Sequence, residues 1–311
     1  MVVVEVENLV KRYKELLAVD HFSMHVNEGE IFGLLGPNGS GKTTTINCIL
    51  SLLSYNKGDI HVFGKKMAPD AYDIKKDIGV VMQNVAVFNE LTVFENIDYF
   101  CGLYITDKKE RVQLVNEAIE FVGLNEFRKF YPKKLSGGLL RRLNIACGIA
   151  HKPRLILLDE PTVAVDPQSR NKILEGIQQL NANGATIIYT SHYMEEVEQI
   201  CSRIMIMDKG KAIAEGTTEE LKSMINLAEK VTMEVFHMPL DILDKLRALP
   251  TILSAEYHTN TLTIKFTQSQ NNLIDLLENL SSYHLHYGKI YSELPSLNDV
   301  FLEITGKELR D

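Results

Sequence analysis

The sequence lacks closely spaced cysteines. Its four cysteines, Cys48, Cys101, Cys147 and Cys201, lie far apart among apolar neighbours. Zinc sites and redox pairs usually need two cysteines within a few residues of each other. The spacing therefore argues against both kinds of site, and we expect all four thiols to be buried.

Long apolar runs and a surplus of basic residues are also missing. No segment reaches the roughly 18 uninterrupted apolar residues of a membrane-spanning helix. The opening MVVVEVENLVKRYKE lacks the basic start and long apolar stretch of a secretory signal. The formal net charge of -8 argues against a broad basic surface. We therefore expect a soluble, cytosolic chain that does not bind nucleic acid.

What the sequence contains indicates two domains, since 311 residues with 45% hydrophobic content can bury about two cores. Runs rich in Ile, Leu and Val without strict alternation are typical of parallel strands covered on both faces, and they occur at IFGLLG, IGVVMQ, RLILLDEP and ATIIYTSH. Residues 167–184 begin with proline and end with glycine, as a crossover helix does. An α/β domain is expected over residues 1–226.

Two other regions have different patterns. Between residues 84 and 153 the strand signals fade, and helical spacing of apolar residues predicts a helical lobe on the α/β core. After residue 226 the expected order of elements is βαββαβ. This order predicts a small α+β, ferredoxin-like C-terminal domain over residues 227–311.

A glycine-rich stretch, GPNGSGKTT, directly follows the apolar run IFGLL. Two glycines with four residues between them, followed by Lys42 and Thr43, match a phosphate-binding loop. Glycines let backbone N–H groups approach phosphate oxygens, and the next helix adds its positive N-terminal end. We expect Lys42 to neutralise the β- and γ-phosphates and Thr43 to bind Mg²⁺. The predicted phosphate-binding residues are Gly36, Pro37, Asn38, Gly39, Ser40, Gly41, Lys42, Thr43 and Thr44.

Two carboxylates, Asp159 and Glu160, follow another apolar run. The carboxyl ends of strands are where α/β sheets bind ligands. Asp159 is predicted to hold Mg²⁺, which leaves Glu160 free to polarise a water for attack on the γ-phosphate. Alone, such a pair is more often a helix cap. The phosphate loop is what favours the catalytic interpretation.

The stretch KLSGGLLRRLNIACGIAHKPRLILLDEP, residues 134–161, resembles the signature of the ATP-binding cassette (ABC) family. Ser136, Gly137 and Gly138 can form an ordinary capped helix start, which is also suited to an anion. The resemblance implies a P-loop ATPase core in which this turn contacts ATP bound to a second copy or to a paralogous cassette. Leu139 stands where many members of the family have a glutamine. Unlike glutamine, a leucine side chain cannot donate or accept a hydrogen bond.

The other family motifs occur in order along the chain. The resemblance implies that Tyr13 stacks on adenine, Gln83 reaches Mg²⁺ and water, Asp166 contacts the dimer partner, and His192 contacts the γ-phosphate. Without the resemblance, Tyr13 would be an ordinary packing or surface residue and His192 a helix cap. Gln83 and His192 complete a predicted catalytic set with Lys42 and Glu160. The resemblance covers roughly the first 220 residues.

Two segments are predicted to couple ATP hydrolysis to another protein. Phe88, Leu91 and Val93 are expected to be exposed where transporter cassettes form a groove for a membrane subunit, although packing within the lobe is an equal alternative for each residue. The end of the chain, residues 296–311, has one apolar helix face. This end resembles ATPase subunits of two-component bacterial exporters of the drug-resistance type.

The resemblance implies an ATP-hydrolysing ABC exporter subunit that is peripheral to the cytoplasmic face of the membrane and powers a separately encoded permease through dimer closure. An importer subunit shares the same nucleotide chemistry. A soluble cassette acting on ribosomes or DNA usually has two cassettes or long coiled coils, and this chain has one phosphate loop and one signature. A non-hydrolysing sensor is disfavoured because Glu160 and His192 are both present.

Overall fold

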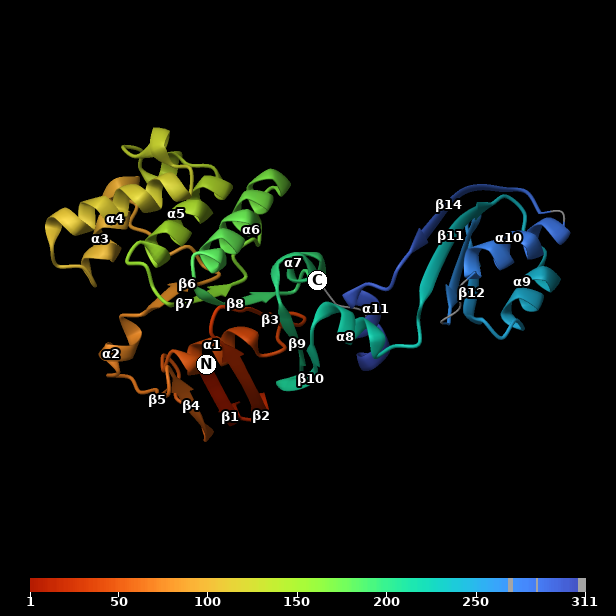
Figure 1. Cartoon of the computed structure of the whole chain (residues 1–311), viewed down its shortest axis with the longest axis horizontal. Coiled ribbons are helices and arrows are strands. Elements are labelled where there is room, and N and C mark those ends of the chain that lie inside the picture. The colour runs from red at the N-terminus through yellow and green to blue at the C-terminus, as the bar shows by residue number, and fades with distance from the viewer. Residues whose placement is uncertain (268–270, 284, 307–311) are drawn as a thin grey trace. The chain divides into compact units, whose positions relative to one another are not determined.

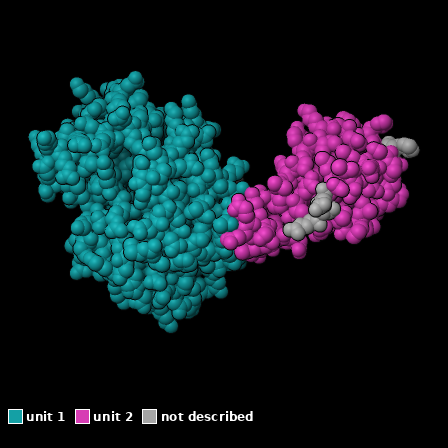
Figure 2. Space-filling model, viewed as in Figure 1, with its two compact units in different colours: residues 1–218, 309–311 teal, residues 219–308 magenta. Residues whose placement is uncertain are grey.

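The computed structural model describes residues 1–267, 271–283 and 285–306 (Figure 1). The chain divides into two compact units: the first comprises Met1–Thr218, and the second begins at Glu219 (Figure 2). The predicted boundary after residue 226 falls within the second unit, between helix α8 (Thr218–Ser223) and strand β11 (Glu229–Val235). Residues 307–311, the end of the predicted C-terminal domain, lie outside the described residues.

A six-stranded sheet forms the centre of the first unit, in the order β10-β9-β3-β8-β7-β6. The strands are β3 (Ile31–Leu35), β6 (Ile78–Val81), β7 (Leu155–Asp159), β8 (Thr186–Ser191), β9 (Arg203–Asp208) and β10 (Lys211–Gly216). All neighbours are parallel except β9 and β10. Strands β3, β7 and β8 are buried along their whole length, which explains their continuous apolar runs. This sheet confirms the predicted α/β class.

A second sheet of the first unit is antiparallel and has the order β2-β1-β4-β5. Its strands are β1 (Val2–Tyr13), β2 (Leu16–Asn27), β4 (Lys57–Val62) and β5 (Lys65–Lys66). Its buried residues, among them Val6, Leu9 and Phe22, share a core with Ile46 of helix α1 (Lys42–Ile49). Sequence analysis did not predict this sheet.

Helices α3 (Val93–Gly102), α4 (Lys108–Phe121) and α5 (Gly137–Ile149) pack against one another and form the helical region in yellow and yellow-green in Figure 1. Side chains of Thr92, Asp107 and Ser136 cap their N-termini. One prediction for this region was wrong. Val93 is fully buried rather than exposed, because it begins α3 and its N–H donates to the Phe130 carbonyl at 2.9 Å.

Two further helices connect strands of the parallel sheet. Helix α6 (Pro167–Ala182) follows β7, and helix α7 (Met194–Ile200) follows β8. Proline stands at the first position of α6, whose N-cap is Asp166, and Ile173, Leu174 and Ile177 are buried. The chain therefore forms the crossover helix predicted over residues 167–184.

The second unit has the predicted βαββαβ order. Its elements are β11 (Glu229–Val235), α9 (Leu240–Arg247), β12 (Ile252–His258), β13 (Thr261–Phe266), α10 (Asn272–Ser282) and β14 (Tyr287–Glu293), followed by α11 (Leu297–Thr305). The antiparallel sheet has the order β12-β13-β11-β14. Alternate strand residues pack with α9 and α10 in one core, as the ferredoxin-like arrangement requires. Across the described ranges, every helix is too short or too polar to cross a bilayer.

Candidate nucleotide-binding site

The phosphate loop connects β3 to α1, and two of its glycines are required by their surroundings. Gly41 is the N-cap of α1 and has a φ of +109°. A Cβ on Gly41 would lie 2.6 Å from the Ala18 carbonyl oxygen, and one on Gly36 would lie 2.2 Å from the Met207 carbonyl oxygen. Only glycine therefore allows the loop to lie this close to β2 and β9.

Lys42 is buried within its own loop. Its Nζ donates to the carbonyl oxygens of Gly36 at 2.7 Å and Pro37 at 3.2 Å, and lies 3.1 Å from Glu160 Oε1. An ammonium group has three donors, and these three oxygens account for them. Burial lowers the pKa of the Lys42 amine, while the charge of Glu160 acts in the opposite direction.

Glu160 stands directly after β7 in a left-handed backbone conformation, with a φ of +47°. This conformation costs a residue other than glycine roughly 1–2 kcal/mol. It is held because the Glu160 N–H donates to Thr190, with distances of 3.0 Å to Oγ1 and 3.2 Å to the carbonyl oxygen. Such strain is often found at functional sites.

The Glu160 carboxylate lies close to three other predicted site residues. Besides its ion pair with Lys42, it accepts a hydrogen bond at Oε2 from Gln83 Nε2 at 3.0 Å. His192 Nδ1 lies 3.3 Å from the same oxygen, within ion-pair distance but without hydrogen-bond geometry. The ends of β6, β7 and β8 therefore bring Gln83, Glu160 and His192 beside the phosphate loop.

Asp159 is fully buried next to Glu160. Its Oδ1 accepts a hydrogen bond from Thr190 Oγ1 at 2.6 Å, whereas Oδ2 has no hydrogen-bond partner among the described residues. Mg²⁺ is commonly bound by one or two carboxylates together with phosphates and waters. No group of three or more His, Cys, Asp or Glu in the described chain could cage a metal. The free Asp159 oxygen and the exposed Thr43 fit a Mg²⁺ held largely by phosphate.

Thr190 is a site residue that sequence reasoning missed. Its hydroxyl accepts from the Glu160 N–H and donates to Asp159, so it fixes both carboxylate residues. The available signal was its position, because it lies in β8 two residues before His192. A hydroxyl at the end of a neighbouring parallel strand lies at the same edge of the sheet as the end of β7.

Ser136 to Gly138 form a second cluster at the start of α5. Ser136 Oγ accepts a hydrogen bond from the Leu139 N–H at 3.3 Å, and Ser136 and Gly137 are exposed. A Cβ on Gly138 would lie 2.3 Å from Ser169 Oγ, so the first turn of α6 rests against this glycine. Within the described chain, no hydrogen bond or ion pair joins this cluster to Lys42 or Glu160.

Asp166 belongs to the same cluster, because it caps α6. Its Oδ1 accepts a hydrogen bond from the Ser169 N–H at 2.9 Å, and this bond lowers the pKa of the Asp166 carboxyl. Tyr13, at the end of β1, is exposed, and Lys11 Nζ lies 4.8 Å from its ring centroid. The structure therefore presents Tyr13 at the surface, and stacking on adenine remains a prediction.

Helix α5 also holds the backbone at Gln83. The buried Arg141 donates through Nη2 to the Gln83 carbonyl at 2.7 Å and through Nη1 to the Met82 carbonyl at 3.1 Å. Asn144 Oδ1 accepts from the Ala86 N–H at 3.1 Å. The helix that begins at the signature therefore fixes the segment that carries Gln83.

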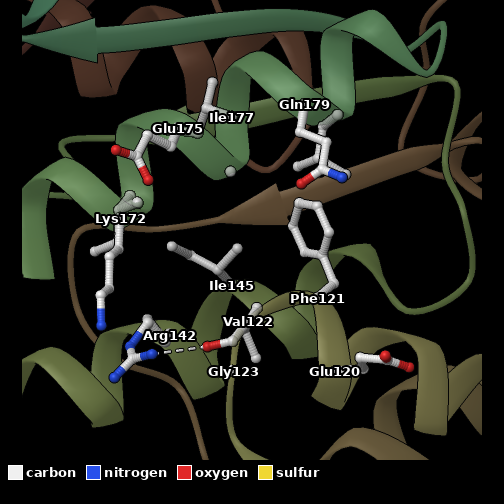
Figure 3. Close-up of a pocket in the computed structure, with 13 residues that line it drawn as sticks. Glu120, Phe121, Val122, Gly123, Arg142, Ile145, Lys172, Glu175, Ile177 and Gln179 are labelled. Carbon is white, nitrogen blue, oxygen red and sulfur yellow. Dashed lines mark hydrogen bonds between the residues drawn. The ribbon is translucent and has the colours of Figure 1, made fainter.

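A separate hollow of about 350 Å³ lies between the end of α4, α5 and α6 (Figure 3). Arg142 Nη1 donates to the Val122 carbonyl at 2.9 Å at its border, and Phe121 points from α4 toward α6. None of the predicted nucleotide-site residues lines this hollow. The candidate site is instead built from the phosphate loop and the strand ends.

Comparisons with known proteins agree with the motifs. A family model described as ABC transporter matches residues 19–163. Linearmycin resistance ATP-binding protein LnrL of Bacillus subtilis is 38% identical to this chain over 99% of each. The chain belongs to the ABC transporter family. This ABC subunit is also 34% identical to daunorubicin/doxorubicin resistance ATP-binding protein DrrA of Streptomyces peucetius, over 99% of this chain and 94% of the relative.

The fold of this chain is also similar to that of a solved ABC structure. A dimeric ATP-binding cassette bound to ADP and Pi in a post-hydrolysis state is 28% identical and has a TM-score of 0.64. The match covers 69% of this chain and 98% of that cassette. The predicted family and the predicted ATPase fold are therefore confirmed, and the family implies nucleotide binding and ATP hydrolysis.

Proposed function

We propose that the chain hydrolyses ATP as one of two paired ATP-binding subunits of an exporter, peripheral to the cytoplasmic face of the membrane. The observation that carries this proposal is the buried contact of the Glu160 carboxylate with Lys42, Gln83 and His192 beside the phosphate loop. A carboxylate at this position is suited to orient and deprotonate a water that attacks a γ-phosphate.

The chemistry begins with competition for Lys42. Phosphate oxygens of ATP would replace the Gly36, Pro37 and Glu160 oxygens as partners of its ammonium group. Glu160, no longer paired with Lys42, would then accept the proton of the attacking water, while His192 would contact the γ-phosphate. Bound Mg²⁺ would neutralise phosphate charge, with Thr43, Gln83 and Asp159 as its predicted protein contacts.

The second half of each ATP site would come from another copy. Ser136 and Gly137 are exposed at the N-terminus of the 13-residue helix α5, where free N–H groups and the helix dipole favour a phosphate. The similarity to a cassette described as dimeric supports this arrangement. Two ATP molecules would thus be gripped between two copies, and Asp166 would lie at their contact.

An aromatic cluster is suited to dock the separately encoded permease. Phe88 and Tyr99 are 42% and 48% exposed, with ring centroids 4.9 Å apart, and Phe100 stacks on Phe88 at 5.8 Å. Asn96 fixes this surface, since it accepts from the Phe88 N–H at 2.8 Å. Exposed aromatic groups are typical anchors of protein interfaces. Phe88 follows Gln83 by five residues, so docking there can act on the site.

The proposed direction of transport is outward. Export is supported by relatives named for drug resistance and by the similar Nod factor export ATP-binding protein I of Ralstonia nicotianae, which is 34% identical over 99% of this chain and 95% of that protein. The test uses inside-out membrane vesicles that contain the chain and its permease, supplied with ATP and candidate amphiphilic compounds. Accumulation inside the vesicles supports export, whereas ATP-driven loss of a preloaded compound supports import.

The same vesicles test the catalytic assignment. Glu160→Gln should slow phosphate release by about 100-fold or more while ATP still binds, because a general base contributes roughly that factor. Phosphate release at the wild-type rate would contradict the role of Glu160, whichever way the compound moves.

A further inference from the structure

A buried carboxylate behind the candidate site belongs to none of the motifs discussed above. Glu196 lies in α7 and is 3% exposed. Its Oε2 accepts hydrogen bonds from three hydroxyl groups, Tyr189 at 2.7 Å, Thr162 at 2.8 Å and Ser191 at 3.0 Å. These three hydroxyl donors offset the cost of burying a polar carboxyl group away from water.

The other carboxylate oxygen faces helix α6. Glu196 Oε1 lies 3.3 Å from Arg170 Nε, within ion-pair distance but without hydrogen-bond geometry. The Arg170 guanidinium also lies over the Tyr193 ring, 5.0 Å from its centroid. Arg170 directly follows Ser169, the residue that rests against Gly138. The carboxylate thereby joins α7 to the first turn of α6.

The donors to Glu196 adjoin the predicted catalytic residues. Thr162 is two residues after Glu160, and Ser191 directly precedes His192. Ser191 Oγ also accepts a hydrogen bond from the Tyr193 N–H at 2.9 Å, so it fixes the backbone on both sides of His192. The ring centroids of His192 and Tyr193 lie 4.1 Å apart. Glu196 can therefore constrain His192 and Glu160 through these hydroxyl residues, without contacting either one directly.

We propose that Glu196 is a positioning residue for ATP hydrolysis, which sets the place of His192 through Ser191 and Tyr193 and that of Glu160 through Thr162. The proposal rests on the proposed hydrolytic function. The ion pair of Glu196 with Arg170 ties these two residues to helix α6, whose N-cap is Asp166. Glu196 thereby links the phosphate-facing groups of one chain to the surface expected to meet the second copy.

The experiment compares steady-state ATP hydrolysis and ATP binding for the wild type, Glu196→Gln and Glu195→Gln. Glutamine keeps the shape of Glu196 but cannot accept all three hydroxyl bonds while facing Arg170. We expect kcat to fall about 10- to 100-fold in Glu196→Gln, as for other misplaced catalytic groups, with the ATP dissociation constant changed less than twofold. Glu195 is exposed on the same helix, and its variant should match the wild type.

A double-mutant cycle with His192→Ala separates positioning from a general loss of structure. The part of the effect that passes through His192 should be lost in this background, so Glu196→Gln should lower kcat by a smaller factor in His192→Ala than in the wild type. Multiplied effects, or a kcat within twofold of the wild type in Glu196→Gln, would overturn the inference. Wild-type hydrolysis by His192→Ala would instead contradict the proposed function itself.

A second variant keeps the test decisive if Glu196→Gln does not fold. Thr162→Val retains the shape of the side chain and removes one donor to Glu196. We expect a lower kcat with unchanged ATP affinity and an unchanged melting temperature within a few degrees. Full activity of this variant, with the protein folded, would show that the hydrogen-bond network does not position the site.

Discussion

Lys42 and Glu160 form an ion pair of 3.1 Å in which each side chain is no more than 5% exposed. The two residues are far apart in the sequence, and they meet because β3 and β7 end at the same edge of the parallel sheet. Removing one partner of such a buried pair destabilises the protein, because the other charge is left buried without a partner. It also holds together the two groups that ATP binding would separate.

The first prediction concerns that penalty. Lys42→Ala should weaken ATP binding at least tenfold and lower the free energy of unfolding by about 3 kcal/mol, because Glu160 is left buried without its cation. A Lys42→Ala, Glu160→Gln double variant should recover most of the stability but none of the ATP affinity. Urea unfolding and calorimetric ATP titration measure the two effects. Unaltered ATP affinity in Lys42→Ala would contradict the role of the phosphate loop.

The second prediction compares neighbouring glycines in the signature. Gly138→Ala should lower hydrolysis and cost about 1–3 kcal/mol of stability, because the new Cβ would lie 2.3 Å from Ser169 Oγ. Gly137→Ala should fold normally, since the nearest atom to its Cβ would be 3.9 Å away. Thermal unfolding and phosphate release should therefore rank Gly137→Ala above Gly138→Ala. The reverse order would mean that α6 does not rest on Gly138 as described.

The third prediction tests the aromatic cluster. A Phe88→Ala, Tyr99→Ala double variant should lose copurification with the permease from detergent-solubilised membranes, because it removes exposed anchors. Basal ATP hydrolysis by the purified chain should change less than twofold. Tyr72→Ala, which removes an aromatic group 75% exposed in another helix, α2 (Tyr72–Lys75), is the matched control. Equal permease recovery with all three proteins would place docking elsewhere.

The fourth prediction concerns the thiols. All four cysteines are buried, and desolvation raises the pKa of Cys101 from its usual 9.0 to about 11. The folded chain should therefore react slowly with a thiol reagent at pH 8. The chain unfolded in guanidinium should react with four equivalents of the reagent, one for each cysteine. Rapid labelling of the folded protein would contradict this burial.

The same shift has a consequence for stability. Above pH 9 the unfolded chain loses the Cys101 proton while the folded chain retains it up to about pH 11, so the unfolded state is favoured as the pH rises. The free energy of unfolding should decrease over this range, and the decrease should be smaller in Cys101→Ala. An identical pH dependence in the two proteins would exclude this contribution.

Sequence patterns predicted the parts of the fold that depend on neighbouring residues. The phosphate loop, the acidic end of β7 and the proline-started helix α6 each combine a local motif with a strand or helix pattern. The antiparallel sheet of β1, β2, β4 and β5 was missed because its pairing joins residues distant in the sequence, such as Val4 with Val62. A short apolar run also does not reveal its pairing partner.

The same limit applied to the site. Lys42, Glu160 and His192 belong to motifs, so their type and order could be recognised from the sequence. Thr190 and Glu196 act through hydrogen bonds to residues on other elements, and no spacing rule marks those partners. Val93 was expected to be exposed because transporter cassettes form a groove in this segment, yet its position at the start of α3 turns its side chain into the core.

The most direct test of the central claim, that two copies grip ATP between them, is the solution mass of Glu160→Gln by analytical ultracentrifugation. With ATP, the mass should rise from that of one chain, 35.2 kDa, to twice that value, and with ADP it should not. Adding Gly137→Arg, at an exposed position where the nearest atom to a new Cβ would be 3.9 Å away, should keep the chain monomeric without preventing ATP binding. A Glu160→Gln chain that binds ATP fully and stays monomeric at every concentration would contradict the account.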